Sequence, residues 1–254
     1  MKYFLTALWA FICIGVLAYS HLSWNKQTSV QAVISEPETK DKQESIEGTI
    51  DHKYIELAGN WPKSAIDKLT LSLKEGNPYK ILFVGSTTSE WENVVSTSIT
   101  DSFGSERVTN ELLTYDLTSE EFVAENKQLE IAAKGAQLIV IEPFLLNDNG
   151  VVTIDVTLAN LTKIIEDIKA DNPGTTFLLQ PSYPIYLPKY YSTQIEELKA
   201  YAKENNITYL DHWTAWPSTD NLEIKEYLDE QQSGPSEKGY QVWAQYLVEY
   251  FVNK

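Results

Sequence analysis

A run of four hydroxyl side chains, residues 86–89, follows a short apolar segment and a glycine in the first third of the chain. The sequence reads Lys80-Ile-Leu-Phe-Val-Gly85 and continues into Ser86 and Thr87. A hydroxyl can attack the carbonyl of an ester, but it is a weak nucleophile unless an adjacent base removes its proton. Ser86 and Thr87 are therefore candidate nucleophiles, with a simple polar strand end as the alternative interpretation.

The other groups that such a reaction needs also follow apolar segments further along the chain. They are Asp116, Glu142, Asn147, Asp148, Asp211, His212 and Asp229. Only His212, of three histidines, follows such a segment, and we hypothesise that it is the base, with Asp211 or Asp229 orienting it. Because Trp213 and Trp216 flank His212, the interpretation that we favour is a packed structural histidine.

Asn147 and the carboxylates each allow two interpretations. The Asn147 amide could donate a hydrogen bond to an oxyanion, or it could hold its own Asn-Asp-Asn-Gly turn. Glu142, Asp148, Asp211 and Asp229 could bind a divalent cation, but their spacing fits no known loop motif. We therefore expect solvated strand-end acids, no metal and no other cofactor.

Five apolar segments alternate with helical patterns and must position these side chains. The predicted strands are residues 80–85, 107–115, 136–142, 175–180 and 207–211. The predicted helices are residues 63–74, 90–101, 118–133, 155–170, 188–205 and 237–251. This order predicts an α/β fold, a single doubly wound five-stranded parallel sheet of the flavodoxin-like type with helices on both faces. The carboxyl ends of its strands form one edge, where ligands bind in such folds.

The arrangement resembles the SGNH/GDSL hydrolase family over essentially all of this region. Gly85-Ser86-Thr87 stands where that family has Gly-Asp-Ser, and Leu145-Leu-Asn147-Asp148 stands for its Gly-x-Asn-Asp block. Pro235-Ser-Glu-Lys-Gly239-Tyr240 matches the segment that follows the family's catalytic histidine. The resemblance implies a nucleophile at Thr87 or Ser86 and an oxyanion site that includes Gly85 and Asn147.

Several residues depart from the family pattern. Gly234 stands where the family has its histidine, Gln231 stands where it has the aspartate, and no glycine follows the second predicted strand. Loss of a triad member leaves only binding and oxyanion stabilisation. Two functions remain open: an acyl (acetyl) esterase acting on cell-envelope glycopolymers, or a catalytically inactive SGNH-fold protein that binds or helps to assemble surface polysaccharide.

Aromatic side chains gather after the fourth and fifth predicted strands. Trp213 and Trp216 could stack on sugar rings beside Asp148, or they could be loop packing. A carbohydrate is the partner that we expect. The formal net charge of −16 over 254 residues argues against a nucleic-acid partner, because few cations would neutralise phosphates.

The N-terminal region predicts attachment to a membrane. Residues 3–24 carry no acidic or basic side chain apart from His21 and are long enough to span a bilayer. We interpret residues 1–25 as an anchor with the rest of the chain outside the cell membrane, and a cleaved signal peptide that would release the protein is the alternative. Residues 26–51 are polar and predict a disordered tether, and residues 52–254 form the folded domain.

Overall fold

The computed structural model describes residues 52–86 and 91–253. The expected anchor and tether, residues 1–51, lie outside this range, and so does the candidate nucleophile Thr87. No helix in the part of the chain that the structure describes is both long and apolar enough to cross a bilayer.

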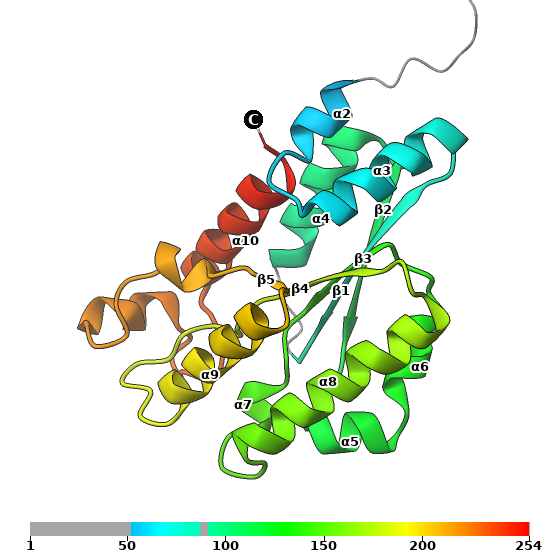
Figure 1. Cartoon of the computed structure of the whole chain (residues 1–254). Helices are drawn as coiled ribbons and strands as arrows, with labels where there is room; N and C mark the ends of the chain where they lie inside the picture. Colours follow the sequence, from blue (N-terminus) through cyan, green and yellow to red (C-terminus); the bar gives the residue numbers. More distant parts are fainter. Residues whose placement is uncertain (1–51, 87–90, 254) are drawn as a thin grey trace, which may run out of the picture. The chain divides into compact units, whose positions relative to one another are not determined.

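A single sheet of five parallel strands forms the centre of the domain (Figure 1). The strands are β1 (Tyr79–Gly85), β2 (Val108–Thr114), β3 (Leu138–Ile141), β4 (Thr176–Leu179) and β5 (Thr208–Tyr209). Their spatial order is β2-β1-β3-β4-β5. The predicted doubly wound parallel sheet is thus confirmed, although β5 has only two residues because the chain leaves the sheet after Tyr209.

The order of the strands places β1 between β2 and β3. The chain passes from β1 outward to β2 and then returns to build the other half of the sheet from β3. This reversal is a topological switch point, and the crevice outside the carboxyl ends of β1 and β3 is where α/β sheets bind ligands. The backbone continues this pairing one residue past β3, since Glu142 N–H donates to Val84 O at 2.8 Å.

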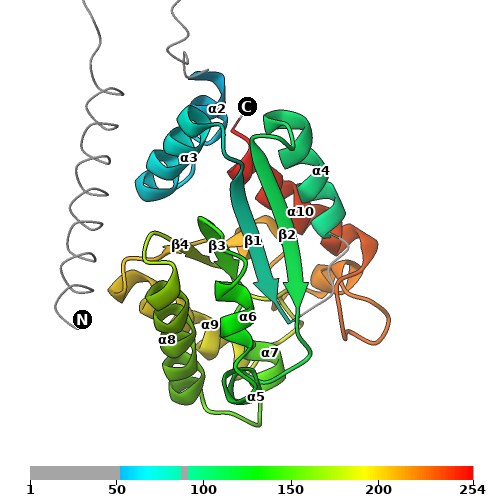
Figure 2. The same ribbon diagram turned by 90° about the vertical axis from the view of Figure 1, so that its right-hand side faces the viewer.

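Helices cover both faces of the sheet. They are α2 (His52–Leu57), α3 (Lys63–Glu75), α4 (Trp91–Phe103), α5 (Ser119–Ala124), α6 (Lys127–Ala132), α7 (Leu145–Asp148), α8 (Ile154–Asp171), α9 (Tyr191–Glu204) and α10 (Glu237–Phe251), with 3₁₀ turns η1 (His212–Ala215) and η2 (Leu222–Tyr227). Figure 2 shows α4 and α10 on one side of β1 and β2 and α6 and α8 on the other.

Two buried clusters follow from the alternation of side chains along β1. Ile81 and Phe83 pack with the first cluster, which includes residues of α3, α4 and α10. Leu82 and Val84 pack with the second, which includes residues of α5, α6, α8 and α9. Since β1 is buried on both faces, its apolar run is nearly continuous, as is usual for parallel strands.

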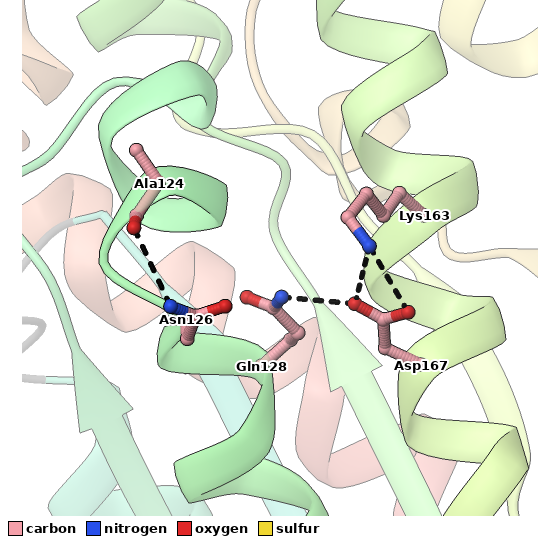
Figure 3. A network of polar contacts seen from close by, with 5 residues as sticks. All are labelled: Ala124, Asn126, Gln128, Lys163 and Asp167. Carbon is pink, nitrogen blue, oxygen red and sulfur yellow. Dashed lines mark hydrogen bonds and ion pairs between the residues drawn. The ribbon is translucent and has the colours of Figure 1, made fainter.

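The helix expected over residues 118–133 is interrupted. It begins as predicted with a capping box between Thr118 and Glu121. It then breaks at Asn126, whose φ of 56° is left-handed, and resumes as α6. Figure 3 shows the result: Gln128 Nε2 donates to Asp167 Oδ2 at 2.9 Å, and Lys163 pairs with the same carboxylate. The break lets α6 turn this buried glutamine toward α8.

Candidate active site

Ser86 and Glu142 meet at the carboxyl edge of the sheet, one residue beyond β1 and β3 respectively. The Ser86 hydroxyl donates to Glu142 Oε1 at 2.8 Å. Ser86 is half-buried, whereas Glu142 is only 1% exposed. A hydroxyl that borders solvent therefore contacts a carboxylate that is almost completely enclosed.

Gly85 is required by the position of that carboxylate. A Cβ atom placed on Gly85 would lie 2.8 Å from Glu142 Oε2 and 3.3 Å from Glu142 Cβ. Any side chain at residue 85 would displace the glutamate, so the glycine that ends β1 makes room for a neighbouring strand's acid. The role expected for Gly85 in an oxyanion site concerns its backbone and remains a prediction.

Tyr183 connects the loop after β4 to the loop before α10. Its hydroxyl donates to Ser233 O at 2.6 Å. Burial, followed by the negative charges of Asp229 and Glu142, raises the pKa of Tyr183 to about 12. The two carboxylates thus act on the same phenol, which remains neutral at physiological pH.

Asp229 holds the loop in which the family's histidine would stand. Its carboxylate accepts hydrogen bonds from the backbone N–H and the hydroxyl of Ser233, both at 2.9 Å. The backbone hydrogen bond is the main reason that the pKa of Asp229 is lowered. A Cβ at Gly234 would lie 3.4 Å from Asp229 Oδ2 and 3.9 Å from the Tyr240 hydroxyl, which are ordinary contact distances. The position of the missing histidine therefore has an acid beside it and no side chain of its own.

His212 lies in the core rather than at the site. It is fully buried and stacks on Trp243, with ring centroids 4.3 Å apart. Its Nε2 lies 3.0 Å from Pro181 O, and its Nδ1 accepts from Trp216 Nε1 at 3.1 Å. Because Nδ1 accepts, Nε2 carries the proton and donates to the carbonyl. Both nitrogens are engaged away from Ser86, which corrects the hypothesis that His212 is the base and agrees with a structural role.

Asp211 does not orient His212. Its carboxylate instead pairs with Lys199 of α9 at 3.1 Å. The expected sugar-stacking role of Trp216 is also corrected, because that side chain is 7% exposed and its indole N–H is bonded to His212. Trp213 is half-buried and donates to Ser182 O at 2.7 Å, so its indole packs the loop after β4.

Asn147 and Asp148, adjacent in α7, have different surroundings. Asn147 Nδ2 donates to Asp116 Oδ1 at 3.2 Å, which uses one of two amide hydrogens. Asp148 is fully buried and accepts from Ser119 N–H at 2.8 Å and from the Thr157 hydroxyl at 2.5 Å. Asp148 therefore joins α7 to the starts of α5 and α8, which corrects its expected contact with substrate.

The described carboxylates do not converge on a cation. Among residues 52–86 and 91–253, no group of three or more histidines, cysteines, aspartates or glutamates is placed to hold a metal ion.

Solved structures with the same architecture identify the fold. No protein-family model matches the sequence, and no curated protein matches it significantly. A carbohydrate esterase family 3 structure from Talaromyces cellulolyticus matches with a TM-score of 0.57 at 13% identity, covering 67% of this chain and 94% of that one. An acetylxylan esterase from Geobacillus stearothermophilus matches with a TM-score of 0.54 at 16% identity, covering 69% and 95%.

A GDSL-like lipase structure from Bacteroides thetaiotaomicron matches with a TM-score of 0.52 at 16% identity, covering 68% of this chain and 87% of that one. The chain has the SGNH/GDSL hydrolase fold. At these identities the likeness establishes the fold and leaves the chemistry to this chain's own residues.

Sequence reasoning missed the pairing of Ser86 with Glu142. It named Glu142 among the polar side chains that follow apolar segments and as one acid of a hypothetical cation site, but it did not pair Glu142 with Ser86. The available signal was local: a buried apolar strand, Leu138–Ile141, runs directly into a glutamate, and the strand expected beside it ends in a glycine. A glutamate that follows a doubly buried strand is held close to the sheet edge and needs a partner there.

Proposed function

We propose that this protein is an extracytoplasmic, membrane-tethered esterase that removes acyl groups, acetyl above all, from cell-envelope glycopolymers. Ser86 is the nucleophile. The observation that carries the proposal is the hydrogen bond from the Ser86 hydroxyl to the buried Glu142, at the edge of an SGNH/GDSL hydrolase fold. Thr87 is the alternative nucleophile and lies outside the described residues.

Acylated carbohydrate is the substrate class because the structural neighbours include an acetylxylan esterase and a carbohydrate esterase. The charges near the edge support a neutral substrate: Glu142 and Asp229 both raise the pKa of Tyr183, and the whole chain carries a formal charge of −16. An anionic polymer would be repelled by such a surface. Attachment through residues 1–25 would keep the enzyme beside the envelope.

The test measures acetate release from an O-acetylated oligosaccharide together with labelling by a fluorophosphonate probe. We expect the wild type to release acetate and to be labelled. Ser86→Ala should abolish both, while Thr87→Val, which keeps the shape but removes the hydroxyl, should retain them. If Thr87→Val loses labelling and Ser86→Ala keeps it, the nucleophile is Thr87.

A second function is favoured by one specific observation, the absence of a side chain at Gly234. With no histidine there and His212 in the core, the fold could bind glycans without hydrolysing them. Binding of the deacetylated and acetylated oligosaccharides with equal affinity, with neither labelling nor acetate release, would decide for a protein that binds or helps to assemble surface polysaccharide.

A further inference from the structure

We propose that Glu142 is the general base that activates Ser86, in the role that a histidine holds in a Ser-His-Asp arrangement. The inference rests on the proposed esterase function and names the group that this function lacks. Among the residues that the structure describes, Glu142 is the acid–base group that forms a hydrogen bond with the Ser86 hydroxyl.

The hydrogen bond orients the hydroxyl for attack. In its ionised form, which is the form that a general base requires, the Glu142 carboxylate only accepts hydrogen bonds, so the proton of Ser86 points along the 2.8 Å line to Glu142 Oε1. The oxygen lone pairs then face away from the glutamate. A carbonyl carbon that approaches from the open side of Ser86 meets those lone pairs, and the proton has an acceptor already in place.

The glutamate is held rigidly. It follows β3 directly, and its backbone N–H donates to Val84 O at 2.8 Å, which fixes it against β1. Its side chain occupies the space over Gly85 that any Cβ would fill. A base on a central strand with little freedom to move keeps its geometry throughout a reaction.

Two neighbouring phenols lie within range of the carboxylate's charge. Burial raises the pKa of Tyr191 well above its ordinary value and that of Tyr183 to about 12, and the negative charge of Glu142 contributes to both. Both phenols remain neutral. Since Glu142 itself is only 1% exposed, bulk water does not screen its interaction with the serine.

The reaction balances in two steps. In the first, Ser86 Oγ forms a bond to the acyl carbon while its proton passes to Glu142. The bond from that carbon to the sugar oxygen breaks, and Glu142 returns the proton to this leaving oxygen. In the second, water attacks the acyl-serine and gives a proton to Glu142, the bond to Ser86 Oγ breaks, and the proton returns to Oγ. The products are the carboxylic acid and the free sugar hydroxyl, and no co-reactant other than water is consumed.

The experiment compares acetate release by the wild type, Glu142→Gln and Glu142→Ala. Glu142→Gln keeps an oxygen that accepts the serine hydrogen bond but cannot take a proton. We expect kcat to fall by about 10²- to 10⁴-fold with little change in KM. Glu142→Ala should regain part of its kcat when formate is added, because formate supplies a carboxylate to the vacated space. Glu130→Gln, which removes an exposed carboxylate of α6, is the matched control.

The outcomes separate the base assignment from the function itself. If the wild type is active, Ser86→Ala is inactive and Glu142→Gln keeps the wild-type kcat, the assignment of the base is overturned while the esterase stands. If Glu142→Gln does not fold, Glu142→Asp replaces it, since it withdraws the carboxylate by one methylene. A lowered kcat at an unchanged melting temperature then supports the base, and an unchanged kcat overturns it. If the wild type neither releases acetate nor reacts with the probe, the proposed function fails and the base fails with it.

Discussion

Replacing His212 by glutamine tests directly whether this histidine is structural. The amide of the introduced glutamine would offer an oxygen to Trp216 N–H and an N–H to Pro181 O, which are the two contacts that the imidazole makes. Unlike the imidazole, the amide does not titrate. The substitution therefore preserves the hydrogen bonds and removes the ability to gain a proton; it also removes the ring stacking on Trp243, a loss that does not depend on pH.

Burial lowers the pKa of His212 from 6.5 to about 3. Between these values the unfolded chain binds a proton that the folded protein excludes, so stability rises with pH. The contribution is fully present above pH 6.5 and is lost as the pH falls toward 3. The difference of roughly 3.5 pKa units, at about 1.36 kcal/mol each, corresponds to about 5 kcal/mol at the acidic end. The expected slope is about 1.4 kcal/mol per pH unit over most of this interval.

The assay is denaturant unfolding at several pH values between 7 and 4. Carboxylates whose pKa values are lowered by hydrogen bonds, such as Glu121 and Asp229, also destabilise the wild type in acid. The difference between the wild type and His212→Gln isolates the histidine. His52→Gln removes an exposed histidine and tells whether the slope belongs to the buried ring.

If the wild type and His212→Gln lose stability equally on acidification, the reasoning is refuted, because burial would then not prevent protonation of the imidazole in the folded protein. At neutral pH we also expect His212→Gln to retain ester turnover. If His212→Gln folds but loses ester turnover, His212 would instead be the base.

Two further predictions concern the loop and helix that follow the site. Gly234→His should raise acetyl-ester kcat by at most about 10²-fold, because it adds an imidazole next to Asp229, where a Cβ meets no contact closer than 3.4 Å, to a site in which Glu142 already supplies a base. Gly234→Asn fills the same space without a base, and an equal gain in both variants would contradict the explanation. Gly239→Ala should lower the free energy of unfolding by about 1–3 kcal/mol, because its Cβ would press on the Tyr227 carbonyl. Urea unfolding measures this loss. Gly76→Ala is the control, because a Cβ there meets no atom within 4 Å but φ is +70°, so that the comparison separates crowding from backbone strain. Unchanged stability in Gly239→Ala would show that the start of α10 can move.

The fold was predictable because its signals are local. Apolar runs such as Leu138–Ile141, helix starts such as the Thr118 capping box and the alternation of strands with helices are each encoded within a few residues. The break at Asn126 was missed because an asparagine can continue a helix or adopt a left-handed φ, and the surrounding structure decides which. The same holds for the length of β5, which ends where the chain leaves its neighbour β4.

The site was only partly predictable because the direction in which a side chain points is not set by the neighbouring sequence alone. His212 follows β5 as a catalytic residue would, but its ring turns inward onto Trp243 of α10, over 30 residues later in the chain. Asp148 likewise turns toward Ser119 and Thr157, which belong to other helices. The contact between Ser86 and Glu142 depends both on β1 and β3 being neighbours and on the direction in which the two side chains point, and neither segment alone shows that direction.

The hydrogen bond between Tyr183 and Ser233 has a consequence for motion. It joins the segment after β4 to the turn before α10, two pieces of chain separated by 50 residues. Neither piece can swing outward on its own without breaking this bond, so opening of the edge should occur as one cooperative event. Amide hydrogens of the two segments would then exchange with solvent at a common rate, and that rate would set an upper limit on how fast product leaves.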